Sequence, residues 1–428
     1  MLETPSRSTR LVAFQHRDFR LLWFGHFIST IGSQMQLVAI DWHVFTLLRG
    51  QSLTLSLFGR PLVLGAEALG LGSLGLVRVI PIVLFALVGG MLADAQDRRR
   101  LMIWTQSAAA LFAAALAFVT LSGRDSIGLI YLLTSAGAAA HAFDNPARQS
   151  LVPNLVPRAH LTNALSLNTL SWQIASIAGP ALTGVLVGRF NIGLIYALNA
   201  LSFLAVILAL LMMNHRGQTA ANGNGGLGWR PLIEGLRFTF GSPLITSTML
   251  LDFFATLFSS ARTMLPIVAG QILGVGVEGY GLLATAQAVG AVAAGTILSL
   301  RREIHRQGVV LLVSVAIYGL ATALFGVSRL FALSYLLFAL TGAGDTVSTV
   351  IRNTIRQTAT PDHLRGRMTS VNMIFFMGGP QLGELEAGLV AAAFGASFSI
   401  VSGGLATVLL TAWVAWRYPW LRRYRSEA

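Results

Sequence analysis

Several ionisable side chains interrupt the long apolar runs of this sequence. Asp41 and Arg78 lie in the first two runs, and Asp252 and Glu384 lie in two later ones. A charged side chain in hydrocarbon costs roughly 2.5–3.5 kcal/mol on insertion scales, so each of these residues needs a partner or a function. A carboxyl group in apolar surroundings can bind and release protons, and a nearby arginine favours its charged form. These residue types therefore predict proton or substrate binding inside a membrane.

Asp41 and Arg78 are the first candidate pair. Asp41 lies in the later part of its run and Arg78 in the earlier part of the next, so two antiparallel helices would bring both residues to the same half of the bilayer. We expect them to approach each other across a cavity, where protonation of Asp41 would release Arg78 for substrate. A permanent structural pair is the alternative. Trp42, beside Asp41, is the aromatic candidate for substrate contact.

Asp252 and Glu384 are the candidate proton sites of the second half, because apolar surroundings favour the protonated form of a lone carboxyl. Arg262 follows Asp252 by ten residues, which is about 15 Å along a helix and too far for direct pairing. The alternative for each carboxyl is a buried group that neighbouring helices satisfy. His26 and His141 also lie in apolar runs, where hydrogen-bonded packing is the favoured role for each.

The composition excludes several other functions. All thirty basic residues are arginine, so the chain has no lysine for a Walker A motif and is not its own P-loop ATPase. Without cysteine it has no disulfide or thiolate metal site. No histidine pair has metal-ligand spacing, and no Ser-His-Asp arrangement is present. We therefore expect no enzyme activity, no metal and no cofactor.

The apolar blocks predict the fold class. Hydrophobic residues make up 54% of the chain and charged residues only 11%, and the blocks are about 20 residues long, the length of a helix that crosses a bilayer. We expect an all-α membrane protein with 12 transmembrane helices in two pseudo-symmetric six-helix bundles. The expected spans are 20–48, 69–93, 99–122, 127–148, 162–188, 192–213, 242–268, 278–300, 307–327, 330–354, 368–393 and 396–417.

The arginines predict the orientation. They cluster in the tails and in every second loop, which is the pattern of the positive-inside rule and argues against nucleic-acid binding. An even number of spans then places both termini in the cytoplasm, in a cell (inner) membrane. The exceptions are Arg49, Arg60, Arg124, Arg189 and Arg329 in the opposite loops, and Arg78 and Arg262 inside spans.

A polar segment divides the spans into two groups of six. The stretch rich in Gly and Asn after residue 213 is a poor helix or strand former and predicts a linker. Asp144 and Arg148-Gln149 after the fourth span are echoed by Asp345 and Arg356-Gln357 after the tenth, which indicates duplication. The expected organisation is a cytoplasmic tail at 1–18, a six-helix bundle at 19–213, a cytoplasmic linker at 214–233, a second six-helix bundle at 234–417 and a tail at 418–428.

The segment 49–65, RGQSLTLSLFGRPLVLG, differs from the other connections. It is too short and too interrupted to span a bilayer. We expect an enlarged external loop near the membrane interface, and its sequence indicates no function.

The run 90–100, GMLADAQDRRR, resembles the signature loop of the major facilitator superfamily. The basic residue that usually follows the Asp is Ala95 here, and the usual second Gly is Asp97. In that family the Asp lies at the cytoplasmic gate, where it bonds to the start of span eleven and to an Arg of span four. The alternative is that Asp94 and its arginines only anchor the topology. The resemblance implies a cytoplasmic gate formed by Gly90, Asp94, Arg98 and Arg148.

Further motifs narrow the resemblance. The runs 142–157, 361–367 and 381–388 resemble the branch of the superfamily that contains enterobactin exporters and macrolide-efflux-like proteins, so the likeness covers essentially the whole chain. The run 178–184, AGPALTG, resembles the Gly-Pro motif of drug:proton antiporters, with Gly179, Pro180 and Gly184 in place. This motif favours export, and tight helix packing is the alternative.

These observations predict a secondary active transporter. We expect a proton-coupled exporter of a small amphipathic molecule (a siderophore, drug or metabolite) that works as a monomer in a lipid bilayer by alternating access. Its partners are then the small-molecule substrate, protons and lipid, with no nucleic acid. An importer or uncoupled facilitator of the same fold is one alternative, and a non-transporting receptor or assembly protein is another.

Overall fold

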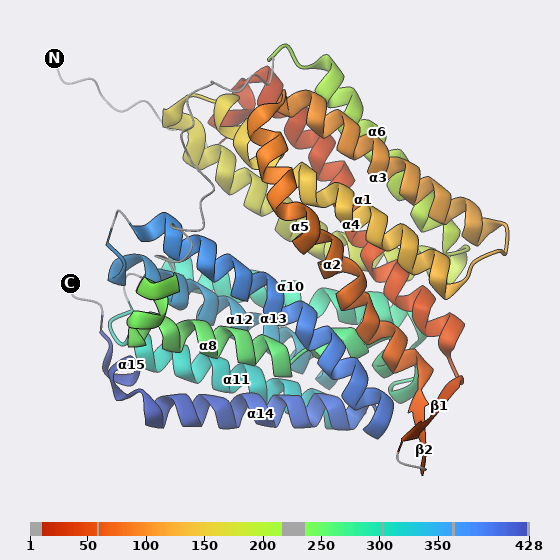
Figure 1. The fold of residues 1–428 in the computed structure, drawn as a ribbon, viewed down its shortest axis with the longest axis vertical. Coiled ribbons are helices and arrows are strands. Elements are labelled where there is room, and N and C mark those ends of the chain that lie inside the picture. The colour runs from red at the N-terminus through yellow and green to blue at the C-terminus, as the bar shows by residue number, and fades with distance from the viewer. Residues whose placement is uncertain (1–10, 58–59, 216–235, 302–303, 362–363, 426–428) are drawn as a thin grey trace. The chain divides into compact units, whose positions relative to one another are not determined.

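The structure, a computed structural model, describes residues 11–57, 60–215, 236–301, 304–361 and 364–425. Nearly all of these residues are helical (Figure 1). The helices of the first part of the chain are α1 (Arg17–Leu48), α2 (Ala66–Ala95), α3 (Arg98–Leu121), α4 (Ile127–Leu151), α5 (Leu161–Arg189) and α6 (Gly193–Met212). Those of the second part are α8 (Pro243–Phe258), α9 (Leu265–Ile267), α10 (Gly276–Leu300), α11 (Gln307–Val327), α12 (Phe331–Ala359), α13 (Arg365–Phe394), α14 (Ala396–Arg417) and α15 (Pro419–Arg423).

Most of the helices lie at the positions of predicted spans. Within the described ranges, 10 helical segments are long and apolar enough to cross a membrane. α1 has 32 residues and α13 has 30, but neither belongs to that set. The all-α membrane fold is therefore confirmed, whereas the number of 12 spans stays a prediction.

The seventh predicted span, 242–268, is not one continuous helix. α8 ends at Phe258, and a 3₁₀ turn, the short α9 and a π-helical turn (Val268–Ile272) continue the segment. Pro266 lies within this stretch, and proline cannot donate the backbone hydrogen bond that a regular α-helix needs. Pro266 lies in the first turn of α9, where its N–H would have no partner within the helix, so proline is tolerated there.

The chain divides into two compact units. Unit 1 comprises residues 1–40 and 77–222, and unit 2 comprises residues 41–76 and 223–428. The predicted linker at 214–233 lies outside the described residues except for its first two. There the backbone N–H groups of Asn214 and His215 donate to the carboxylate of Asp18. The end of α1 and the start of α2 belong to unit 2, so these two helices connect the units.

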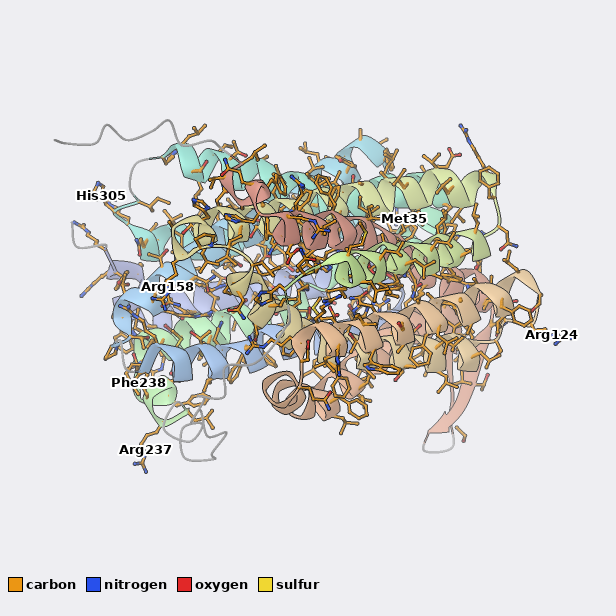
Figure 2. The ribbon with its side chains drawn as sticks, turned by 90° about the horizontal axis from the view of Figure 1, so that it is seen from above. Met35, Arg124, Arg158, Arg237, Phe238 and His305 are labelled. Atoms are coloured by element: carbon orange, nitrogen blue, oxygen red, sulfur yellow. The ribbon has the colours of Figure 1, made fainter. Side chains whose placement is uncertain are left out.

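In unit 1, α3 packs against both α4 and α6. The core beneath their ends includes Phe19 and Met102, which are fully buried. Figure 2 shows Arg124, in the turn between α3 and α4, at one end of the unit and Arg158, before α5, at the other end. Successive connections therefore alternate between the two ends, as antiparallel spans require.

In unit 2, α11 packs between α12 and α14, α10 packs against α12, and α8 packs against α13 (Figure 1). Leu311 and Ile355 are fully buried in the core between these helices. Arg237 and His305 lie at the same end of the unit (Figure 2). Both residues belong to connections that the arginine pattern assigns to the cytoplasm.

The predicted loop at 49–65 contains a β-hairpin. β1 (Ser52–Leu57) and β2 (Arg60–Gly65) pair in antiparallel register, with Leu53 opposite Leu64. The sequence signal for β1 is the alternation of leucine with serine and threonine over SLTLSL, which has the period of a strand. The hairpin was not predicted because an alternation over six residues is weak evidence for a strand in a chain of long apolar helices. β2 packs against α13.

Candidate functional site

Helices α8, α12 and α13 build a charged site inside unit 2. Asp252 comes from the middle of α8, and Arg352 and Arg356 lie one turn apart near the end of α12. Residues four apart on a helix face the same side, so α12 presents both guanidinium groups to α8. All three side chains are buried.

Asp252 bridges the two arginines. Its Oδ1 lies 2.9 Å from Nη2 of Arg352, and its Oδ2 lies 3.5 Å from Nη2 of Arg356. A single buried carboxylate therefore contacts two guanidinium groups. Such a group is stable in the interior only while its partners remain charged and hydrogen-bonded.

Neutral acceptors satisfy the other donors of Arg356. Its Nε donates to Oγ1 of Thr248 at 3.1 Å, and its Nη2 donates to the Thr248 carbonyl at 2.9 Å. Its Nη1 donates to the side-chain oxygen of Asn372 in α13. These bonds hold the guanidinium in one orientation between the three helices.

Arg352 has weaker support. Its Nη2 donates to Oγ1 of Thr349 at 2.8 Å and lies 3.7 Å from Asp345, whose side chain is half exposed. Its Nε is buried without a hydrogen-bond partner. A buried donor left without a partner costs about 1–3 kcal/mol. Arg352 is therefore the least satisfied charged group of this site.

A cavity of about 340 Å³ opens beside these residues. Its charged lining residues are Asp252, Arg352 and Arg356. The polar and apolar lining residues are Thr349, Asn353, Gln357, Thr369 and Asn372, with Met368, Met373 and Phe376 of α13. The cavity thus has both a cationic and an apolar wall.

Unit 1 contains a second buried charge network. Asp144 of α4 accepts hydrogen bonds from Gln106 Nε2 at 2.9 Å and from Thr105 Oγ1 at 3.2 Å, both on α3. Its Oδ2 lies 3.8 Å from Nε of Arg148, one turn later on α4. Arg148 also donates to the side-chain oxygen of Asn145. Here one carboxylate faces one guanidinium.

A cavity of about 260 Å³ adjoins this network. Asp144 and Arg148 line it together with His26 of α1 and His141 of α4. The Nδ1 atom of His26 is buried without a hydrogen-bond partner. The other lining residues are Ser29, Thr30, Ser33, Gln34, Leu37, Gln106, Asn145 and Trp172.

The two networks occupy related places in the chain. The sequence echo equates Arg148 of α4 with Arg356 of α12, and both line a cavity of their own unit. One turn earlier, unit 1 has Asp144 where unit 2 has Arg352. Unit 2 receives its carboxylate from another helix instead, at Asp252. The same position therefore carries opposite charges in the two units.

The predicted pair of Asp41 and Arg78 is not among the lining residues of either cavity. Both side chains are partly buried, and Asp41 belongs to unit 2 whereas Arg78 belongs to unit 1. Their mutual approach stays a prediction. Trp42 stacks on Tyr280 of α10, with ring centroids 5.3 Å apart, and it also contacts Phe45.

Glu384 of α13 lies against α2. A Cβ added at Gly75 would be 2.8 Å from the Cβ of Glu384, so only glycine allows this approach. One turn earlier on α2, a Cβ at Gly72 would be 2.7 Å from the Cα of Gly388. α2 and α13 therefore cross in close contact within unit 2, and the proton-binding role of Glu384 stays a prediction.

The predicted cytoplasmic gate is only partly described. Gly90 and Asp94 belong to α2, but the side chains of residues 86–95 lie outside the described set. Arg98 donates from Nη1 to the Ser150 carbonyl of α4 at 3.1 Å. A bond between Asp94 and Arg148 therefore stays a prediction.

The antiporter-like motif of α5 packs against α1. A Cβ at Gly179 would lie 2.5 Å from the Cβ of Gln34, and Thr183 donates to the Met35 carbonyl at 3.1 Å. Pro180 and Gly184 are buried beside them. This local geometry is the close packing that small residues permit between membrane helices.

The residues missed at the sequence level are Arg352 and Arg356. They were assigned to the cytoplasmic end of span ten, whereas α12 continues to Ala359 and buries both. The available signal was the spacing of two arginines four residues apart, at the end of an apolar run that also contains Asp345. An intramembrane Asp without a partner on its own helix requires such a cation elsewhere.

Curated proteins with similar sequences are exporters. The chain is 26% identical to the enterobactin exporter EntS of Citrobacter koseri, with 92% of each chain covered. It is likewise 26% identical to EntS of Salmonella typhi, with 92% of each chain covered. EntS of Escherichia coli O81 is 25% identical over 83% of this chain and 81% of its own.

Solved structures with the same fold are transporters. A bacterial homologue of the human lysosomal transporter Spinster aligns with a TM-score of 0.67 and 13% identity, covering 98% of this chain and 97% of that one. The nucleoside transporter NupG aligns with a TM-score of 0.72 and 12% identity, covering 94% of this chain and 100% of that one. At these identities the likeness concerns the fold alone.

A family description fits almost the whole chain. The transmembrane secretion effector family, a branch of the major facilitator superfamily, matches residues 8–426. This match confirms the resemblance that the gate and span-four motifs carry. The chain is a multi-pass, non-enzymatic membrane transporter that belongs to the transmembrane secretion effector family.

Proposed function

We propose that this transporter is a proton-coupled exporter of a small amphipathic molecule. The observation that carries the proposal is the buried Asp252, held by Arg352 and Arg356 beside a cavity within apolar helices. Among the described lining residues, Asp252 is the one carboxylate of this cavity, and it contacts both guanidinium groups. Its charge therefore affects what the cavity attracts.

The direction and substrate class are inferred from the relatives. Their name, enterobactin exporter, supports outward transport of a siderophore or a molecule of similar character. The cavity of unit 2 combines charged and apolar lining residues, which suits an amphipathic substrate. The Gly-Pro motif of α5 favours antiport with protons, as in the drug exporters that it resembles.

The arginine pattern supports an inner-membrane location with both termini in the cytoplasm. A monomer is the working form that we propose. In this arrangement Asp94 and Arg148 latch the cytoplasmic side when the carrier faces outward, and Asp41 with Arg78 forms a further charge pair. Alternating access would move one unit against the other around the substrate.

Inverted membrane vesicles test the proposal, because their lumen corresponds to the outside of the cell. Vesicles that contain the protein should accumulate enterobactin when the lumen is acidified, and control vesicles without it should not. A panel with macrolide drugs and amphipathic metabolites extends the test to other substrates. Loss of preloaded substrate from the lumen under the same gradient would instead indicate an importer. No movement of any compound in either direction would overturn the proposal.

A further inference from the structure

The geometry points to an oxyanion site in the cavity of unit 2, in which Arg352 and Arg356 bind a carboxylate or phenolate group of the substrate. The inference rests on the proposed transport function and specifies the class of molecule transported: an amphipathic anion with an apolar or aromatic body. Its basis is an excess of positive over negative charge among the described lining residues of this cavity.

The excess follows from the groups that face the cavity. Two guanidinium groups carry two positive charges, and their hydrogen-bond acceptors Thr248, Thr349 and Asn372 are neutral. Asp252 is the carboxylate that lines the cavity, and Asp345 approaches Arg352 from outside the lining. Among the described lining residues, two positive charges therefore face one negative charge.

Arg352 provides a hydrogen-bond donor that has no acceptor among the described residues. Its side chain is only 3% exposed, and its Nε has no hydrogen-bond partner. Arginine binds oxyanions through two parallel N–H groups, one of which is often Nε. Asp252 and Thr349 both accept from Nη2 of Arg352, and a substrate oxyanion would accept the hydrogen bond that Nε can still donate.

The opposite wall fits the rest of such a molecule. Met368, Met373 and Phe376 of α13 line the same cavity. Methionine side chains adapt to irregular apolar shapes, and the volume of about 340 Å³ lies within the range of small-molecule pockets. The substrate would place its anionic group toward α12 and its apolar body toward α13.

Unit 1 provides an internal comparison. Its cavity has one guanidinium, Arg148, and one carboxylate, Asp144, which also accepts two hydrogen bonds from α3. Charge is balanced there unless a histidine is protonated. Unit 2 has a second guanidinium, Arg352, one turn before Arg356, and this extra positive charge favours anions in its cavity.

Binding of a matched pair of probes tests the inference. The full-length protein in lipid nanodiscs would be titrated with 2-naphthoate and with the neutral 2-naphthamide, which has the same ring system. We expect the acid to bind at least tenfold more tightly than the amide. Arg352→Gln and Arg356→Gln should each abolish this preference. Arg329→Gln, which removes the same charge from an exposed loop of unit 2, should retain it.

Asp252→Asn gives a result that a purely structural ion pair would not. It removes the competing carboxylate and should tighten binding of 2-naphthoate severalfold while leaving 2-naphthamide unchanged. Unchanged or weaker binding of the acid would overturn the inference, even if the arginine variants fail to fold. Equal affinity of the native protein for acid and amide would overturn it as well.

Transport of the same probes separates this inference from the proposed function. Accumulation of acid and amide at equal rates in inverted vesicles would contradict the oxyanion site and leave the transporter intact. A preference for the acid in binding, without transport of any compound in the panel, would support the site and contradict the proposed export.

Discussion

Asp252 of α8 and Arg352 of α12 form a buried ion pair, with Oδ1 and Nη2 2.9 Å apart. Arg356 shares the same carboxylate from one turn further along α12, at 3.5 Å. These contacts join two helices that are far apart in sequence, and they lie beside a cavity. Substitutions in this pair should therefore affect both the stability of unit 2 and binding in the cavity.

Removal of the shared carboxylate should destabilise unit 2. Asp252→Ala leaves two buried guanidinium groups without a counter-charge, and a broken buried pair costs about 3–5 kcal/mol. Thermal unfolding in detergent micelles should show a lower Tm for Asp252→Ala and for Arg352→Gln. The double variant should be less destabilised than the sum of the two, by roughly 0.5–3 kcal/mol. Strict additivity would contradict a direct interaction.

The network of unit 1 should respond to the shape of the side chain at position 144 as well as to its charge. Asp144→Ala removes the acceptor of Gln106 and of Thr105. Thr105 can still donate to the Met102 carbonyl, so one buried donor, Nε2 of Gln106, is left unpaired at a cost of about 1–3 kcal/mol. Asp144→Asn keeps one acceptor oxygen and should lower Tm by much less. Equal losses for Ala and Asn would show that these two hydrogen bonds contribute little.

The contact between α2 and α13 should be essential for transport. The Cα atoms at Gly72 and Gly388 approach so closely that neither tolerates a Cβ without a shift. Gly72→Ala and Gly388→Ala should therefore each lower transport in inverted vesicles and the Tm in detergent micelles. Gly378→Ala on α13 is the matched control, because a Cβ there would meet nothing within 4 Å. Native transport and Tm in both contact variants would contradict the close approach.

The fold followed from the sequence more completely than the site did. Apolar blocks predicted most helix positions because a helix must satisfy its own backbone in lipid. The hairpin at 52–65 was missed because a leucine alternation of six residues is a weak signal beside helices of twenty or more. The duplication that the likeness of Arg148 and Arg356 indicates stays a prediction.

The partner of Asp252 could not be found from local spacing. Arg352 and Arg356 belong to another helix, and only the packing of α8 against α12 brings them to Asp252. Arg262 lies beyond the end of α8, in the 3₁₀ turn that follows it, so the estimate of its distance from Asp252 along one helix does not apply. Long-range ion pairs depend on tertiary structure, and a single sequence shows only that each charge needs a partner.

Asp41 should affect coupling if it pairs with Arg78 as predicted. Asp41→Asn removes a titratable group from the outer part of α1 and should abolish the dependence of transport on the pH gradient. Asp18→Asn is a suitable comparison, because Asp18 only accepts backbone N–H groups at Asn214 and His215. Unchanged transport and pH dependence in Asp41→Asn would remove this residue from the mechanism.

Proton movement driven by substrate tests the central claim most directly. Inverted vesicles containing a trapped pH indicator would be exposed to enterobactin without any imposed gradient. The account predicts that the lumen becomes more alkaline as substrate enters, since a proton leaves the lumen in each transport cycle, and that Asp41→Asn shows no such change. Entry of enterobactin with no change of luminal pH in the native protein would contradict proton-coupled export.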